Sequence, residues 1–76
     1  MAAVKNPGET TISVAKRKAE GWYNWMLSNI PTSDALWRGL LNFIGFIEQN
    51  PGERRKIKDY TTRMESAMQQ KGYDNG

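Results

Sequence analysis

The tetrapeptide Asn-Pro-Gly-Glu occurs twice in this chain, at 6–9 and at 50–53. In each copy an Asn stands where it can cap a helix, a Pro occupies the first helical position, and a Glu three residues after the Asn can reach back to the cap. The segment 31–34, Pro-Thr-Ser-Asp, offers a third start with a hydroxyl cap and a carboxylate at the positive end of the helix dipole. The sequence therefore predicts an all-α fold, a small three-helix bundle with helices at about 7–29, 33–49 and 51–71.

The length of the chain predicts one helical domain that spans residues 1–76. Residues 1–5 and 72–76 are interpreted as short flexible tails, because Gly72 is a natural helix C-cap after Lys71. A domain of this size buries only about 60–65% of its unfolded surface and is marginally stable alone. A partner or self-association would therefore help it to fold.

The composition excludes several kinds of chemistry. The chain contains neither cysteine nor histidine, which removes disulfides, thiolate metal sites and the usual general base. It also lacks a GxxxxGK phosphate loop, an HExxH pair and a calcium loop. We therefore expect a non-enzymatic protein with no cofactor, no metal site and no small-molecule substrate.

The location of the protein is predicted from three observations. The absence of cysteine fits a reducing compartment, and the N-terminal residues lack the long apolar stretch of a signal peptide. The longest apolar run, 36–47, is interrupted by Arg38 and Asn42 and is shorter than the ~20 residues that span a bilayer. We expect a cytoplasmic protein with no transmembrane segment.

The middle helix is unusually apolar. On a helical wheel its apolar side chains cover an arc of about 220°, whereas a surface helix shows a stripe of about 100° or somewhat more. Two neighbouring helices could cover much of this arc, but we expect Trp37 and Leu41 at one margin and Phe46 at the other to stay exposed. With Leu40 and Ile44 they would form a partner-binding surface. Complete covering of the arc, which would give a monomer, is the alternative.

The two outer helices each carry one apolar stripe at three- and four-residue steps. In the first helix the predicted core stripe consists of Ile12, Ala15, Ala19, Trp22, Tyr23 and Met26. In the third helix it consists of Ile57, Tyr60, Met64, Ala67 and Met68.

The basic residues form two clusters that could meet at one end of the bundle, since the first and third helices run parallel in an up-down-up arrangement. Trp25 stands close enough to add a stacking ring, a combination typical of single-strand nucleic-acid binders. Nearby acidic residues make a solvated charged face the alternative interpretation. The candidate nucleic-acid-binding residues are Lys16, Arg17, Lys18, Trp25, Arg54, Arg55, Lys56 and Lys58.

Three functional hypotheses follow. The first is a small interaction or assembly protein that forms a homo-oligomer, with a dimer favoured, or binds another protein through its middle helix. The second is nucleic-acid binding through the basic end, which a net charge of +3 permits. The third is binding to a membrane surface by the apolar middle helix. In its doubled cap and tryptophan content the chain is similar to small accessory proteins of phages and viruses.

Overall fold

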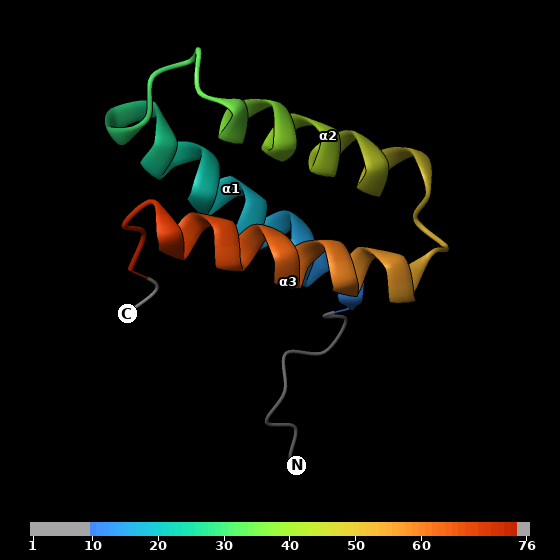
Figure 1. Ribbon diagram of the computed structural model, residues 1–76. Coiled ribbons are helices and arrows are strands. Elements are labelled where there is room, and N and C mark those ends of the chain that lie inside the picture. Colours follow the sequence, from blue (N-terminus) through green and yellow to red (C-terminus); the bar gives the residue numbers. More distant parts are fainter. Residues whose placement is uncertain (1–9, 75–76) are drawn as a thin grey trace.

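Three helices follow one another along the chain, and each packs against the other two (Figure 1). The computed structural model describes residues 10–74, in which α1 spans Thr11–Asn29, α2 spans Ala35–Gln49 and α3 spans Arg54–Gln70. Helix α2 runs antiparallel to α1, and α3 turns back to run parallel to α1. The described residues contain no strand. The predicted all-α three-helix bundle is confirmed.

Helix α1 begins later than the sequence predicted. Thr10 is its N-cap: the backbone is extended there, and the Thr10 hydroxyl oxygen accepts a hydrogen bond from the backbone N–H of Ser13 at 3.1 Å. Helix α1 therefore begins at Thr11, four residues after the predicted start. The predicted cap at Asn6 lies outside the described residues.

The second Asn-Pro-Gly-Glu segment closes a turn and does not open a helix. The backbone N–H of Asn50 donates to the carbonyl of Phe46 at 2.8 Å, which makes Asn50 the C-cap of α2. The N–H of Glu53 then donates to the carbonyl of Asn50 at 3.1 Å, with Pro51 at the turn position that suits its fixed φ. Helix α3 starts after this turn, without a side-chain cap, so the predicted start at Pro51 is wrong.

A carboxylate caps α2, where a hydroxyl was predicted. Asp34 has extended backbone, and its Oδ1 accepts the N–H of Leu36 at 2.8 Å. The Asp34 N–H itself donates to the carbonyl of Pro31 at 2.9 Å, which tightens the connection from α1. The helix therefore begins at Ala35, two residues after the predicted position.

The end of α3 is fixed by a glycine and an aromatic ring. Gly72 has φ +105°, a conformation that favours glycine, and its N–H donates to the carbonyl of Gln69. The N–H of Tyr73 donates to the carbonyl of Met68 at 3.0 Å, which completes a Schellman motif. Tyr73 is half-buried and meets Trp25 edge-on at 5.4 Å between ring centroids. Tyr73, which belongs to the predicted tail 72–76, thus packs against α1.

The core lies where the three helices meet. The ring of Phe43 in α2 lies between Trp22 of α1 and Tyr60 of α3, at centroid distances of 6.0 and 5.0 Å. The one buried polar residue among those described, Thr61, donates its hydroxyl to the carbonyl of Ile57 at 2.8 Å. The fully buried large side chains are Trp22, Met26, Leu40, Phe43, Ile47, Ile57 and Met68.

Candidate interaction surfaces

One margin of the apolar arc of α2 is covered by α1. Trp37 is only 7% exposed, its indole N–H donates to the carbonyl of Ile30 at 2.9 Å, and the ring of Tyr23 meets it edge-on at 5.4 Å. The expectation that Trp37 remains exposed is therefore wrong. The end of α1 and the broad ring of Tyr23 cover more of the arc than a helix with small side chains would.

The other margin is covered by α3. Phe46 is half-buried against the ring of Tyr60, at 5.9 Å between centroids. Its exposure is thus smaller than predicted. Leu40 is fully buried and Ile44 is half-buried. Of the five residues proposed for partner binding, Leu41 alone is strongly exposed, at 55%.

Two further large apolar side chains are exposed, and both belong to α1. Tyr23 is 39% exposed and Leu27 is 59% exposed, and they lie one helical turn apart on the same side of α1. Leu41 lies one turn after Trp37, which contacts Tyr23. We call Tyr23, Leu27 and Leu41 the apolar face.

The sequence interpretation missed the contribution of α1 to this surface. It placed Tyr23 in the core and left Leu27 unassigned. Both residues lie to one side of the line formed by the buried Ala15, Ala19, Trp22 and Met26. This offset on the helical wheel was the feature of the sequence that could have indicated their exposure.

A hollow of about 210 Å³ opens between α1 and α2 beside the apolar face. Apolar side chains form its walls, and both signs of charge stand at its rim. The two helices contribute Lys16, Ala19, Glu20, Tyr23, Ile44, Ile47 and Glu48. The hollow is thus an apolar depression with two carboxylates and one ammonium around it.

A second, larger groove runs between α1 and α3, with a volume of about 550 Å³. It brings together Lys18 from the first basic cluster with Arg54 and Lys58 from the second. We call it the basic groove. Its lining residues are Thr10, Thr11, Val14, Lys18, Arg54, Lys58, Thr61, Thr62 and Glu65.

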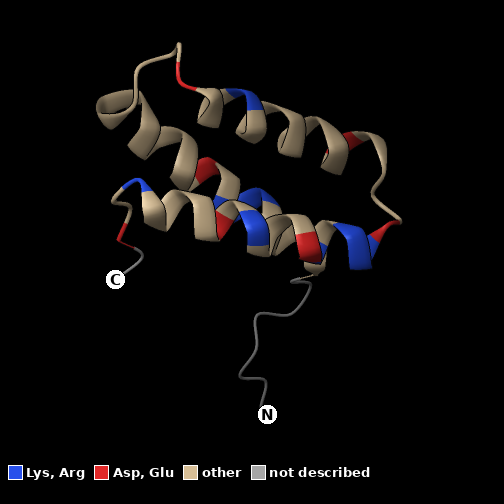
Figure 2. Cartoon of the chain, viewed as in Figure 1, with Lys and Arg blue, Asp and Glu red and all other residues tan. Residues whose placement is uncertain are grey.

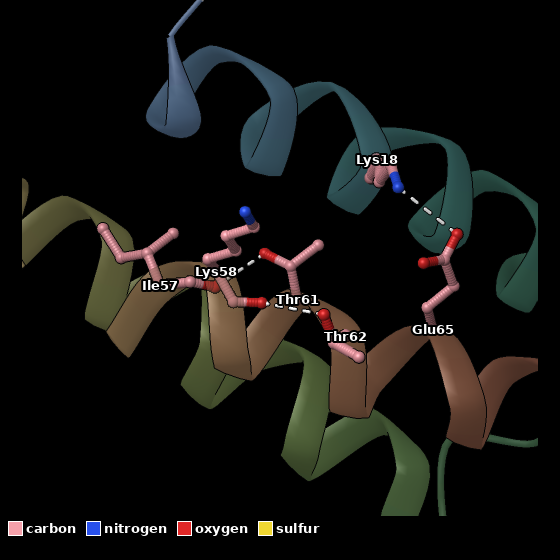
Figure 3. A network of polar contacts seen from close by, with 6 residues as sticks. All are labelled: Lys18, Ile57, Lys58, Thr61, Thr62 and Glu65. Carbon is pink, nitrogen blue, oxygen red and sulfur yellow. Dashed lines mark hydrogen bonds and ion pairs between the residues drawn. The ribbon is translucent and has the colours of Figure 1, made fainter. Parts of the chain in front are cut away.

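Polar contacts inside the basic groove already use some of its groups (Figure 3). The ammonium of Lys18 lies 3.3 Å from a carboxylate oxygen of Glu65. The hydroxyls of Thr61 and Thr62 donate to the carbonyls of Ile57 and Lys58 one turn earlier in α3, at 2.8 and 3.1 Å. These hydroxyl protons and the ammonium of Lys18 are thus engaged within the groove, which is also lined by the cationic side chains of Arg54 and Lys58.

The other predicted nucleic-acid-binding residues do not join the basic groove. Lys16 lines the hollow on the opposite side of α1. Trp25 is half-buried against Tyr73, so its ring is not an open stacking platform. Arg17, Arg55 and Lys56 are exposed, and none of them lines the groove.

The basic clusters are also interrupted by acidic residues. Figure 2 shows acidic segments between the basic ones along α3. One of the cations, Lys56, lies 4.0 Å from the carboxylate of Glu53. Of the residues predicted to form a basic end, only Lys18, Arg54 and Lys58 line one groove, and Glu65 lines it with them.

Asp34 is the titratable group whose environment is most clearly altered. The hydrogen bond from the backbone N–H of Leu36 lowers the pKa of its carboxyl, and the hydrogen bond from Lys71 lowers it further. Both partners favour the ionised form. The carboxylate therefore holds the first turn of α2 to the end of α3.

Comparison with known proteins returns no relative: no family model, no curated protein and no solved structure matches this chain. Within residues 10–74, no helix is long and apolar enough to cross a membrane. No group of three or more acidic side chains in that range is placed to hold a metal ion. The fold defines the chain as a small three-helix bundle.

Proposed function

We propose that this chain is a non-enzymatic interaction protein that pairs with a second copy of itself through the apolar face. The observation that supports this proposal is the exposure of three large apolar side chains, Tyr23, Leu27 and Leu41, of which Tyr23 also lines an apolar hollow between α1 and α2. Burying a leucine side chain that was exposed contributes about 1.5–3 kcal/mol. In a dimer with two-fold symmetry each such contact is made twice.

The charges around the apolar face favour a second copy over other occupants. Lys16 and Arg38 stand near it, and so do Glu20 and Glu48. An anionic bilayer surface attracts faces rich in Lys and Arg, whereas this face carries both signs. A surface with balanced charges can be complementary to itself.

The test is the mass of the protein in solution. Light scattering from about 1 µM to about 100 µM should show the mass of one chain, 8.7 kDa, rising to twice that value as the concentration increases. The double variant Leu27→Ser, Leu41→Ser should remain a folded monomer. A mass of one chain for the unmodified protein at every concentration would refute the self-pairing.

A matched control variant tests whether association depends on the apolar face itself or is weakened by any loss of apolar surface. Val14 is half-buried in the basic groove, on the other side of α1. Val14→Ser removes apolar area without touching the apolar face and should leave the dimer intact. Loss of the dimer in this control would show that association does not depend on the apolar face.

Nucleic-acid binding is a second candidate function, supported by one observation. Lys18, Arg54 and Lys58 come from two helices and line a single groove. Three phosphate contacts on a single strand predict a slope of about −2 in a plot of log affinity against log salt.

Anisotropy of a labelled single-stranded oligonucleotide tests this second candidate. The variant Arg54→Glu, Lys58→Glu should lose binding, and the control Arg55→Glu, on the same helix but outside the groove, should keep most of it. If the unmodified protein does not bind at low salt, the candidate is wrong.

A further inference from the structure

The outer side of α2 carries a regular stripe that the proposed self-association can use. Arg38, Leu41, Gly45 and Glu48 follow one another at steps of three, four and three residues, which places them along one side of the helix. Arg38 and Glu48 are exposed and Leu41 is 55% exposed. The stripe therefore contains a cation, a large apolar side chain, a glycine and a carboxylate in that order.

The charges of this stripe stand near opposite ends of the helix. Arg38 is the single cation of α2 and Glu48 its single carboxylate. Figure 2 shows the basic segment near the start of α2 and the acidic one near its end, with uncharged residues between them. Within the part of the chain that the structure describes, neither side chain forms an ion pair. Both charges are thus available to a partner.

Gly45 leaves room for a side chain from outside. A Cβ added at this glycine would meet nothing within 4 Å. The neighbouring Ile44 and Glu48 line the hollow beside it. A large apolar side chain that approaches Gly45 can therefore contact the helix backbone and the wall of the hollow together.

We infer that α2 pairs with α2 of a second copy in an antiparallel register centred beside Phe43. Phe43 lies midway in sequence between Arg38 and Glu48 and midway between Leu41 and Gly45. A two-fold axis there places Leu41 of each copy against Gly45 of the other, and Arg38 of each copy against Glu48 of the other. This register rests on the self-association proposed above and specifies its geometry.

Charge complementarity selects this register over a parallel one. In a parallel pair in register Arg38 would face Arg38 and Glu48 would face Glu48, and like charges facing each other across an interface disfavour the complex. In the antiparallel pair both ends of the contact join opposite charges. Glu20 and Lys16 also stand at the rim of the hollow and carry opposite charges, so the carboxylate of Glu48 leaves this rim with an excess of negative charge where the incoming Arg38 lies.

Two charge reversals and their mixture test the register. In a dimer of Arg38→Glu chains two carboxylates meet at both ends, and in a dimer of Glu48→Arg chains two guanidinium groups meet at both ends. Each variant alone should therefore dimerise at least about tenfold more weakly than the unmodified protein. In a mixed pair the carboxylate introduced at position 38 of one chain faces the guanidinium introduced at position 48 of the other. At the opposite end the original Arg38 faces the original Glu48, so the equimolar mixture should recover the dimer.

Native mass spectrometry reads out the mixture, because the two variants differ in mass, and sedimentation gives the dissociation constants. Arg55→Glu on α3 makes the same change in net charge as Arg38→Glu, away from the stripe, and should dimerise like the unmodified protein. Circular dichroism checks that each variant remains helical, as expected for exposed positions.

The outcomes separate this inference from the proposed function. If the unmodified protein dimerises but the mixture forms no heterodimer, the register is wrong and self-association stands. If either reversal leaves dimerisation unchanged, the register is also wrong. If the unmodified protein is monomeric at every concentration, both the register and the self-association fail.

Discussion

The carboxylate of Asp34 and the ammonium of Lys71 lie 2.9 Å apart. Asp34 caps the first turn of α2, and Lys71 is the C-cap of α3, so this ion pair joins the beginning of one helix to the end of another. The same carboxylate accepts the backbone N–H of Leu36. A single side chain therefore acts in capping and in tertiary contact at once.

This arrangement predicts a pH dependence of stability. The pKa of Asp34 is lowered in the folded protein, so its contribution is present above the unfolded value of about 3.9 and is lost as the pH falls through the folded pKa. We expect Asp34→Ala to lower the melting temperature at neutral pH, and the difference from the unmodified protein to shrink below about pH 4. Thermal melts followed by circular dichroism measure this. An equal difference at neutral and acidic pH would show that the charge of Asp34 does not contribute.

Trp37 is predicted to stabilise the fold without taking part in association. Trp37→Phe removes the indole donor to the carbonyl of Ile30 and should lower the free energy of unfolding by about 1–2 kcal/mol, with the dimer mass unchanged. Urea unfolding and light scattering measure the two effects. Trp25→Phe is the control at a half-buried position and should cost less. A monomeric Trp37→Phe protein of unchanged stability would contradict this assignment.

Gly72 is predicted to be required for the end of α3. Gly72→Ala forces an L side chain into a positive φ and should cost about 1–2 kcal/mol of stability. Gly52, in the turn before α3, has no positive φ, and a Cβ there meets nothing within 4 Å. Gly52→Ala should therefore be neutral or slightly stabilising in the same chemical unfolding experiment. Equal losses at the two positions would refute the conformational argument.

Leu27 is predicted to matter for association and not for folding. It is 59% exposed, so Leu27→Ser should change the free energy of unfolding of the monomer by at most about 0.5 kcal/mol. If the apolar face mediates pairing, the same change should weaken the dimer at least about tenfold. Sedimentation equilibrium measures the dissociation constant. An unchanged constant would remove Leu27 from the interface.

Local sequence signals predicted the number, order and approximate extent of the helices. Apolar periodicity alone placed Ala15, Trp22, Met26 and Met68 in the core, where they are buried. The role of Gly72 at the end of α3 was equally predictable, because a glycine after a helical stripe has a specific backbone role. These signals depend on a residue and its close neighbours in sequence.

The wrong prediction of a helix start at Pro51 arose because the same short motif is compatible with two local structures. Asn-Pro-Gly-Glu satisfies the rules for a helix start, but it also fits a β-turn with Pro51 at the second position. Distance between helices decides which one forms, because α2 and α3 must be joined closely enough to pack. That requirement is not visible in four residues.

The exposure of the middle helix could not be predicted from its own wheel. Whether Trp37 is covered depends on the size and direction of Tyr23, a residue of another helix. The convergence of Lys18 with Arg54 and Lys58 likewise depends on how α1 and α3 are rotated about their axes. Both are properties of packing between segments distant in sequence.

The position of Tyr73 has a practical consequence for any shortened version of this protein. Its ring lies on Trp25, and a methyl group added at Gly21 would come within 3.7 Å of its hydroxyl oxygen. A truncation after Gln70 would keep all three helices at full length, yet it would open the seam between α1 and α3 to water. A shortened version of the protein should therefore keep Tyr73, although this residue lies after the end of α3.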